Sequence, residues 1–159
     1  MGIKEFDYPE PTNKKIILKD ILEIEKVSVK YYLSEVYLQT LRDHKARHES
    51  KGNGFGYEII SDSGIANAVV CGGMGRERNL VYDDRLTDFT PVTNIKGEVN
   101  KEGIRKMTPR EWARLQGYPD SYRIVVSDAQ AYKQFGNSVA VPAIQATAKK
   151  IIKKLGIPC

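Results

Sequence analysis

The spacing of apolar and polar residues predicts helices toward both ends of the chain and short strands between them. Near the N-terminus, Pro9 and Pro11 each disfavour the helical conformation of the residue before them. We therefore predict an extended lead-in over residues 1–15. A short helical turn around residues 18–23 and a longer helix around 34–48 follow, and the longer one has only a moderate apolar stripe.

The central region changes to short apolar runs separated by glycine. Seven of the thirteen glycines lie between Lys51 and Gly75. Runs typical of strands cover residues 57–60, 65–71 and 79–82, and a further hairpin is expected over 93–104. These features predict a small twisted β region whose glycine loops bring the backbone close to a partner. Ordinary tight turns explain the glycines at 72–75 equally well.

Helices with clear start signals are predicted after residue 105. Thr108-Pro109-Arg110-Glu111 forms a capping box with proline at the first helical position, so that the side chains of Thr108 and Glu111 satisfy free amide groups. Ser127 begins a second box, and Pro142 starts the last helix. That helix carries lysines on one side and apolar residues on the other: Ile144, Ala148, Ile151, Ile152 and Leu155.

The length of 159 residues, with 41% hydrophobic and 28% charged residues, fits one modest core. The predicted fold is α+β: a small twisted β region with glycine-rich loops, flanked by short helices and an amphipathic C-terminal helix. The chain lacks an apolar run of about 18 residues and an apolar stretch typical of a signal peptide. We therefore expect a cytoplasmic protein that does not bind a membrane.

Charge is unevenly distributed. From Lys101 onward there are eleven basic and four acidic residues, a net charge of +7, whereas the residues before it carry a net charge of −2. A basic excess attracts polyanions such as nucleic acid. The solvated faces of helices explain the same charges without any partner.

Histidine and cysteine residues offer few candidates for a metal site. His44 and His48 are four residues apart, which would place two ligands on one helix face. No acidic or cysteine residue accompanies them at a metal-site spacing, so we expect exposed helix histidines. Cys71 and Cys159 form no CxxC pair, and neither a disulfide framework nor a zinc site is expected.

Two segments carry a more specific signal. Residues 105–120 read RKMTPREWARLQGYPD, and residues 130–142 read QAYKQFGNSVAVP. In order and separation they resemble the last two signature motifs of the DNA (cytosine-5) methyltransferase family. Trp112 stands where that family commonly has cysteine, and we interpret it as a core residue. The lead-in over residues 6–11 and the glycine-rich centre are also placed as in that family.

The resemblance implies a role for each motif. The first is mainly an organiser that holds the target-recognition region, and its candidate residues here are Thr108, Arg110, Glu111, Arg114 and Gln116. The second lines the pocket for S-adenosylmethionine, with Asn137, Ser138 and Val139 as candidates. Short donors and acceptors after Gly136 suit a polar cofactor, although an ordinary helix C-cap and turn would use the same residues.

The glycine-rich centre then resembles the target-recognition region, with two loops that enter the major groove of double-stranded DNA. The loops cover roughly residues 51–58 and 72–79. The planar fork of an arginine can grip guanine O6 and N7 or a phosphate, and the sequence leaves both roles open. The candidate DNA-binding residues are Asn53, Gly54, Phe55, Gly73, Gly75, Arg76 and Arg78. The family often has threonine in the strand before the second loop, where this chain has Ala68-Val69.

The resemblance also implies parts that we do not find in this sequence. The family flips its target cytosine out of the duplex and attacks it with a cysteine from a Pro-Cys loop. Cys71 follows valine in a predicted strand, and we interpret Pro158-Cys159 as a coincidence. No catalytic residue is therefore expected in this chain.

We expect the nucleophile and most of the cofactor site on an N-terminal catalytic half, in cis or in trans, and no activity from this chain alone. Residues 1–33 would be a lead-in from that half, 34–126 the target-recognition domain and 127–159 a closing segment. The whole would serve a restriction-modification system, and the C-terminal helix would self-associate when its partner is absent. A stand-alone, non-catalytic DNA-binding or interaction module on the same scaffold is the alternative.

Overall fold

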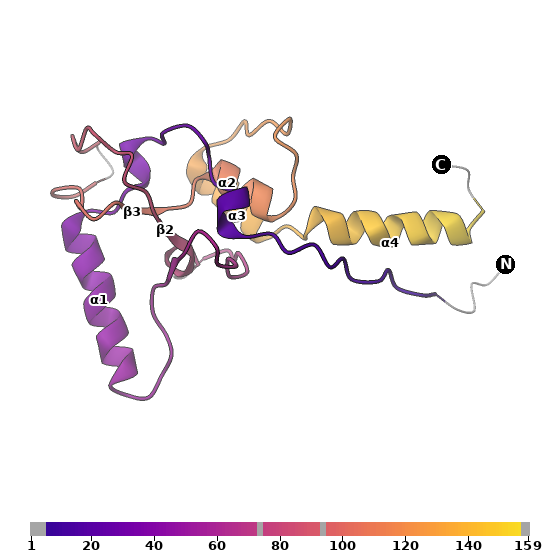
Figure 1. Cartoon of the computed structure of the whole chain (residues 1–159), viewed down its shortest axis with the longest axis horizontal. Helices are drawn as coiled ribbons and strands as arrows, with labels where there is room; N and C mark the ends of the chain where they lie inside the picture. The colour runs from indigo at the N-terminus through magenta and orange to yellow at the C-terminus, as the bar shows by residue number, and fades with distance from the viewer. Residues whose placement is uncertain (1–5, 73–74, 93–94, 157–159) are drawn as a thin grey trace.

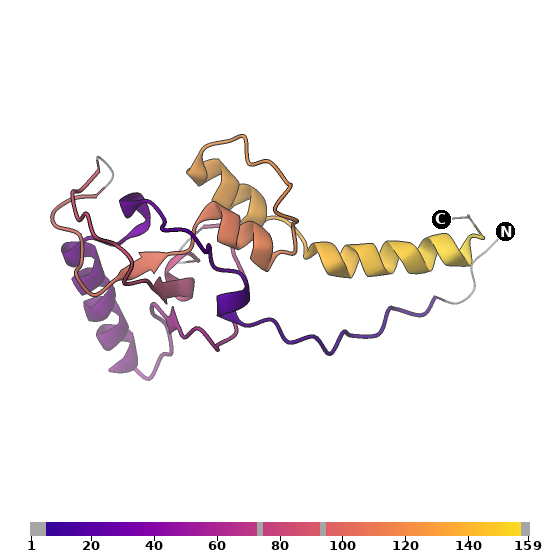
Figure 2. The ribbon, with the colours of Figure 1, turned by 45° about the horizontal axis from the view of Figure 1, so that its top comes forward.

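The computed structural model describes residues 6–72, 75–92 and 95–156. They form a mixed body from which two segments project in parallel (Figures 1 and 2). The α+β class predicted from the sequence is confirmed. Its helices are α1 (Glu35–Glu49), α2 (Pro109–Leu115), α3 (Asp128–Gly136) and α4 (Val141–Lys154), its strands are β1 (Ile59–Ile60), β2 (Leu80–Tyr82) and β3 (Ile104–Lys106), and short 3-10 turns cover Leu18–Asp20, Val29–Tyr31 and Glu77–Asn79.

A three-stranded sheet lies at the centre, in the order β1-β2-β3. β1 pairs with β2 in parallel, with Ile59 opposite Leu80, and β2 pairs with β3 in antiparallel fashion, with Leu80 opposite Lys106. Leu80 and Val81 are fully buried. β2 therefore connects the glycine-rich region to the first of the two signature motifs.

The strand predicted over residues 65–71 is wrong, because the chain there takes no regular structure. A side chain replaces the neighbouring strand: the buried amide of Asn79 accepts a hydrogen bond from Asn67 N at 2.7 Å and donates one to Asn67 O at 3.0 Å. One asparagine thus satisfies both backbone groups of a residue. The segment is held in place without forming a strand.

The hairpin predicted over residues 93–104 is also wrong for the described part of that range. Thr93 and Asn94 lie outside the described residues, and β3 begins only at Ile104. The buried side chain of Asn100 instead donates to the carbonyl oxygens of Leu33 and Ile104 and accepts from the Ile104 amide. This local network takes the place of the expected ladder.

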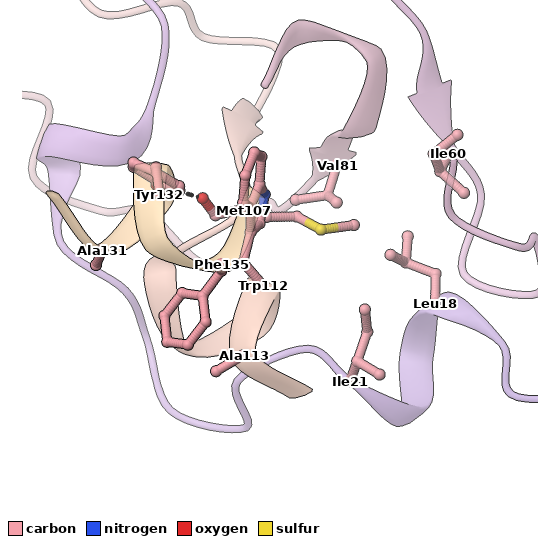
Figure 3. Close-up of a cluster of buried hydrophobic side chains, with 10 residues drawn as sticks. All are labelled: Leu18, Ile21, Ile60, Val81, Met107, Trp112, Ala113, Ala131, Tyr132 and Phe135. Carbon is pink, nitrogen blue, oxygen red and sulfur yellow. Dashed lines mark hydrogen bonds between the residues drawn. The ribbon is translucent and has the colours of Figure 1, made fainter. Parts of the chain in front are cut away.

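The main core joins elements that are distant in sequence (Figure 3). Trp112, which is 1% exposed, lies at its centre, as the sequence predicted for a core residue. Its ring makes an edge contact with that of Tyr132 at 5.0 Å between centroids, which packs α2 against α3. The buried members are Leu18, Ile21, Ile60, Val81, Met107, Trp112, Ala113, Ala131, Tyr132 and Phe135.

The predicted helix boundaries follow from their caps. The Thr108 hydroxyl accepts from Glu111 N at 3.2 Å, and the Glu111 carboxylate accepts from Thr108 N at 2.7 Å, which completes the predicted box. Gly117 ends this part of the chain with a φ of +80° and packs against Pro142, where a Cβ would clash. This left-handed conformation strongly favours glycine.

α4 and the lead-in project from the body beside each other in both views (Figures 1 and 2). Phe6 and Asp7 of the lead-in line one hollow together with Lys150, Lys153 and Lys154 of α4. No residue of α4 is buried, and Ile144, Ile151 and Leu155 are about half exposed. In the described part of the chain, no helix is long and apolar enough to cross a membrane.

Candidate nucleic-acid interface

A buried ion-pair network holds together the elements that carry the candidate loops. The guanidinium of Arg105, which is inaccessible to solvent, donates to both carboxylate oxygens of Glu111 at 2.8 Å and to Asp83 at 2.8 Å. Glu111 also accepts from the backbone amides of Thr108 and Glu23. Each buried charge thus has charged and hydrogen-bonding partners, as burial requires.

Asp83 extends this network to the N-terminal segment. It accepts from Arg85 at 2.7 and 2.8 Å, and Arg85 in turn donates to the carbonyl oxygens of Glu23, Ile24 and Glu25. Burial by itself would raise the pKa of Asp83, but the hydrogen bonds from Arg85 and Arg105 outweigh it and hold that pKa well below its usual range. The sequence prediction missed Asp83 and Arg85, because their partners Arg105 and Glu23 lie far from them along the chain.

The depressed pKa of Asp83 predicts acid sensitivity. An unfolded aspartate has a pKa of about 3.9, so the stabilising contribution of Asp83 is fully present above that value, begins to fall below it and is lost as the pH falls through the lower pKa of the folded state. D83N should lower the free energy of unfolding by about 2 kcal/mol at pH 7. Urea titrations should show that this difference narrows at pH 3. D84N, at the exposed neighbouring position, is the matched control, and an unchanged difference at pH 3 would contradict the assignment.

The first candidate loop folds back onto α1. Asn53, Gly54 and Phe55 are exposed, and the Asn53 amide donates to the His48 carbonyl oxygen at 3.0 Å. Phe55 makes an edge contact with His48, whose ring lies 4.4 Å from that of His44. Both histidines are half-buried, so their predicted exposure is wrong, and Phe55 of the loop packs against His48. Among the described residues, no three His, Cys, Asp or Glu side chains gather as a metal site.

The second candidate loop alternates between outward and inward side chains. Arg76 and Arg78 are exposed. Glu77, which lies between them, and Asn79, which follows them, are buried. Gly75 is buried against the backbone of Val70, where a Cβ would lie 2.5 Å from the carbonyl oxygen. Gly73 lies outside the described residues. The alternation presents two arginines to solvent from an anchored turn.

Glu77 is an anchor that the sequence prediction missed. Its carboxylate accepts from the Tyr37 hydroxyl at 2.9 Å and pairs with Lys106 at 3.3 Å. Burial, with help from Glu77, raises the pKa of Tyr37 to about 12, so the phenol keeps the proton that it donates. The loop is thereby attached to α1 and β3.

The predicted organiser residues make long-range contacts, apart from the cap formed by Thr108 and Glu111. Arg114 pairs with Asp120 at 2.7 Å and donates to the carbonyl oxygens of Ile21 and Leu22. The Gln116 side chain donates to Phe135 O at 2.9 Å, and the backbone carbonyl oxygen of Gln116 accepts from Val141 N. Arg110 donates to Tyr122 O at 2.7 Å. These residues fix α2 to the N-terminal turn, to α3 and to the start of α4.

The candidate cofactor segment links α3 to α4. Asn137 is the C-cap of α3 and is exposed, and Val139 is 61% exposed. The half-buried Ser138 hydroxyl accepts from the Tyr118 hydroxyl at 3.3 Å. The helix C-cap considered as an alternative is therefore present, and it leaves the Asn137 side chain at the surface.

The chain matches known proteins over nearly its whole length. The family model for C-5 cytosine-specific DNA methylase matches residues 1–153. The type II methyltransferase M.HpaII of Haemophilus parainfluenzae is 75% identical over 155 residues, which cover 98% of this chain and 43% of that protein. The type II methyltransferase M.SsoII of Shigella sonnei is 38% identical over 154 residues, 96% of this chain and 36% of that protein. The chain thus spans less than half the length of these relatives.

Solved structures share the fold. The structure of the S. pombe Dnmt2 methyltransferase matches with a TM-score of 0.64 at 19% identity, over 91% of this chain and 44% of that one. The methyltransferase EhMeth of Entamoeba histolytica matches with a TM-score of 0.62 at 15% identity, over 98% of this chain and 46% of that one. At these identities the likeness concerns the fold alone.

Proposed function

The chain belongs to the C-5 cytosine-specific DNA methylase family, and from this premise we propose that it supplies target recognition and cofactor closure to a DNA (cytosine-5) methyltransferase. The observation that carries the proposal is a turn that exposes Arg76 and Arg78 to solvent. The buried side chains of Glu77 and Asn79 anchor this turn. Two guanidinium groups held by an anchored turn can recognise nucleobase edges and phosphates in double-stranded DNA. The type II relatives extend the proposal to a restriction-modification system.

The proposal divides the chain by role. Residues 34–126 form the target-recognition domain, residues 1–33 lead into it, and residues 127–159 close the cofactor site. In the recognition domain, Asn53, Gly54, Phe55, Gly75, Arg76 and Arg78 face the DNA. The half-exposed apolar residues of α4 pack on a catalytic part that carries the nucleophilic cysteine, and two copies of the chain cover this surface when that part is absent.

S-adenosylmethionine supplies the methyl group when it is bound. The donor set after α3 fits one edge of such a polar cofactor, because Asn137 is exposed and Ser138 offers a hydroxyl beside it. Val139, which is 61% exposed, adds an apolar surface. In this proposal these residues orient the cofactor, while the catalytic half binds most of it.

Methyl transfer by reconstituted protein tests this proposal. The purified 159-residue chain should transfer no labelled methyl group to cytosine-containing duplex DNA, because the proposed nucleophile lies on the catalytic half. A mixture with a candidate N-terminal half should transfer it, and N137A should reduce transfer by about tenfold by removing one hydrogen bond to the cofactor. The matched control is N13A, at an exposed asparagine of the lead-in.

Three outcomes separate the alternatives. Turnover by the chain alone would contradict the assignment of the nucleophile to another part. DNA binding without transfer in any mixture would favour the stand-alone module. Light scattering of the isolated chain tests the role of α4, since a monomer at high concentration would contradict the proposed apolar docking surface.

A further inference from the structure

A hollow of about 240 Å³ lies between the second candidate loop and α3. Cys71 and Arg76 line it from the loop side, and Tyr132 and Lys133 line it from α3. The hollow therefore joins a segment proposed to contact DNA with the helix that leads into the cofactor segment. The proposed function gives the loop and α3 separate roles, and it gives no role to the contact between them.

Arg76 is held on the ring of Tyr132. The carbon of its guanidinium lies 5.4 Å from the ring centroid, within the range of a cation–π contact. Tyr132 is 8% exposed, its hydroxyl donates to Met107 O at 2.5 Å, and its edge contacts Trp112. Figure 3 shows this ring among the core residues with its hydrogen bond to Met107. The Tyr132 ring that supports Arg76 is therefore part of the core.

One close backbone contact fixes the loop to α3, and a second closes the loop on itself. A Cβ on Gly136 would lie 2.8 Å from Cys71 N and 3.0 Å from its Cα, so the helix and the loop touch directly. Gly75 packs equally closely on Val70. Gly136 thus ties Cys71 to α3, Gly75 is tied to Val70 next to it, and the contact of Arg76 with the Tyr132 ring places Arg76 beside Lys133 on the same helix.

The charges around the hollow favour an anion. The described residues that line it include Arg76 and Lys133 and no carboxylate. The nearby acidic residues are engaged elsewhere: Asp128 pairs with Lys30 at 2.7 Å, and Glu77 is turned toward Tyr37 and Lys106. Arg78 differs, because the hollow that it lines contains Phe55, His44 and His48 and, among the residues that the structure describes, no second arginine or lysine.

We propose that Arg76 and Lys133 together hold one backbone phosphate of the bound DNA, with Tyr132 as the positioning residue for Arg76, so that base reading is left to Arg78. This inference rests on the proposed role in DNA recognition. A phosphate presents several oxygens and a full negative charge to two cations at once. A guanine edge is uncharged and is matched by the fork of one arginine, so a second fixed cation favours the phosphate.

The salt dependence of DNA binding distinguishes the two roles. The full chain is titrated by fluorescence anisotropy, at several salt concentrations, against a duplex selected by the wild type from a random pool and against a scrambled duplex. R76A and K133A should each weaken binding to both duplexes by the same factor, roughly tenfold, and reduce the salt slope by about 0.9. R78A should weaken binding to the selected duplex only.

Conservative variants test positioning separately from folding. R76K keeps the charge and should keep the salt slope, although its affinity falls because the planar stack is lost. Y132F keeps the ring and should retain the wild-type slope, whereas Y132L should approach R76A. Thermal melts verify that each variant is folded, and K101A, an exposed lysine before β3, is the control for loss of one charge.

The possible failures are distinguishable. If R76A weakens binding to the selected duplex alone, or leaves the salt slope unchanged, Arg76 reads a base and the inference is wrong. If R76K behaves like R76A in its slope, the phosphate role is equally excluded. If the wild type binds no duplex at low salt, the proposed recognition function itself fails, and this inference fails with it.

Discussion

R105A should lower the free energy of unfolding by about 3–5 kcal/mol, because it leaves the buried Glu111 carboxylate without its cation and leaves Asp83 with Arg85 alone. Asp83 and Glu111 are 5% and 0% exposed, so water cannot replace the guanidinium. Domains of this size are stable by only about 5–15 kcal/mol in total. R105A should therefore be largely unfolded at temperatures at which the wild type is intact.

Urea titration followed by circular dichroism measures this effect. The matched control is R42A, which breaks an ion pair of the same type, with Glu102 at 2.7 Å, on the surface. That loss should cost less than about 1 kcal/mol. If R105A were as mild as R42A, the buried network would not be what joins the N-terminal turn, β3 and α2.

W112A should cost about 3–5 kcal/mol through the cavity that it opens in the main core. Trp112 is 1% exposed and contacts Tyr132, which links α2 to α3. The same loss should reach the surface proposed to bind DNA, since Tyr132 also supports Arg76. Differential scanning calorimetry gives the stability, and anisotropy with duplex DNA gives the affinity.

Two variants sharpen the test of Trp112. W112F keeps an aromatic ring and should lose less stability than W112A. W112C introduces the residue that the family commonly has at this position, and it should be nearly as destabilising here because the surrounding core fits an indole. The exposed V36A is the control for loss of apolar side-chain volume. A W112C variant as stable as the wild type would show that this core adapts to the smaller side chain.

Local signals predicted the helices well. The capping box at Thr108 and the glycine at position 117 act within a few residues, and α2 begins and ends where they indicate. The strand predicted from the apolar run at 65–71 failed because an apolar run does not show which partner satisfies the backbone. Here that partner is the side chain of Asn79.

The supporting residues of the candidate site were harder to predict than the exposed ones. Arg76 and Arg78 were singled out because their chemistry is visible in the sequence. Glu77 was not, since its role depends on Tyr37, forty residues earlier. Asp83 likewise depends on Arg105, twenty-two residues later. Pairs of residues that meet only in the folded chain produce no periodic pattern in the sequence.

The close contact between Gly136 and Cys71 bears on how this family could exchange sequence specificity between its members. A transplanted recognition segment that ends anywhere between residues 80 and 127 would bring a foreign loop against the native α3. Chimaeras should therefore carry residues 70–79 and 128–136 from the same parent. The unit that carries specificity would then consist of two segments that touch in the folded protein but are separate along the chain.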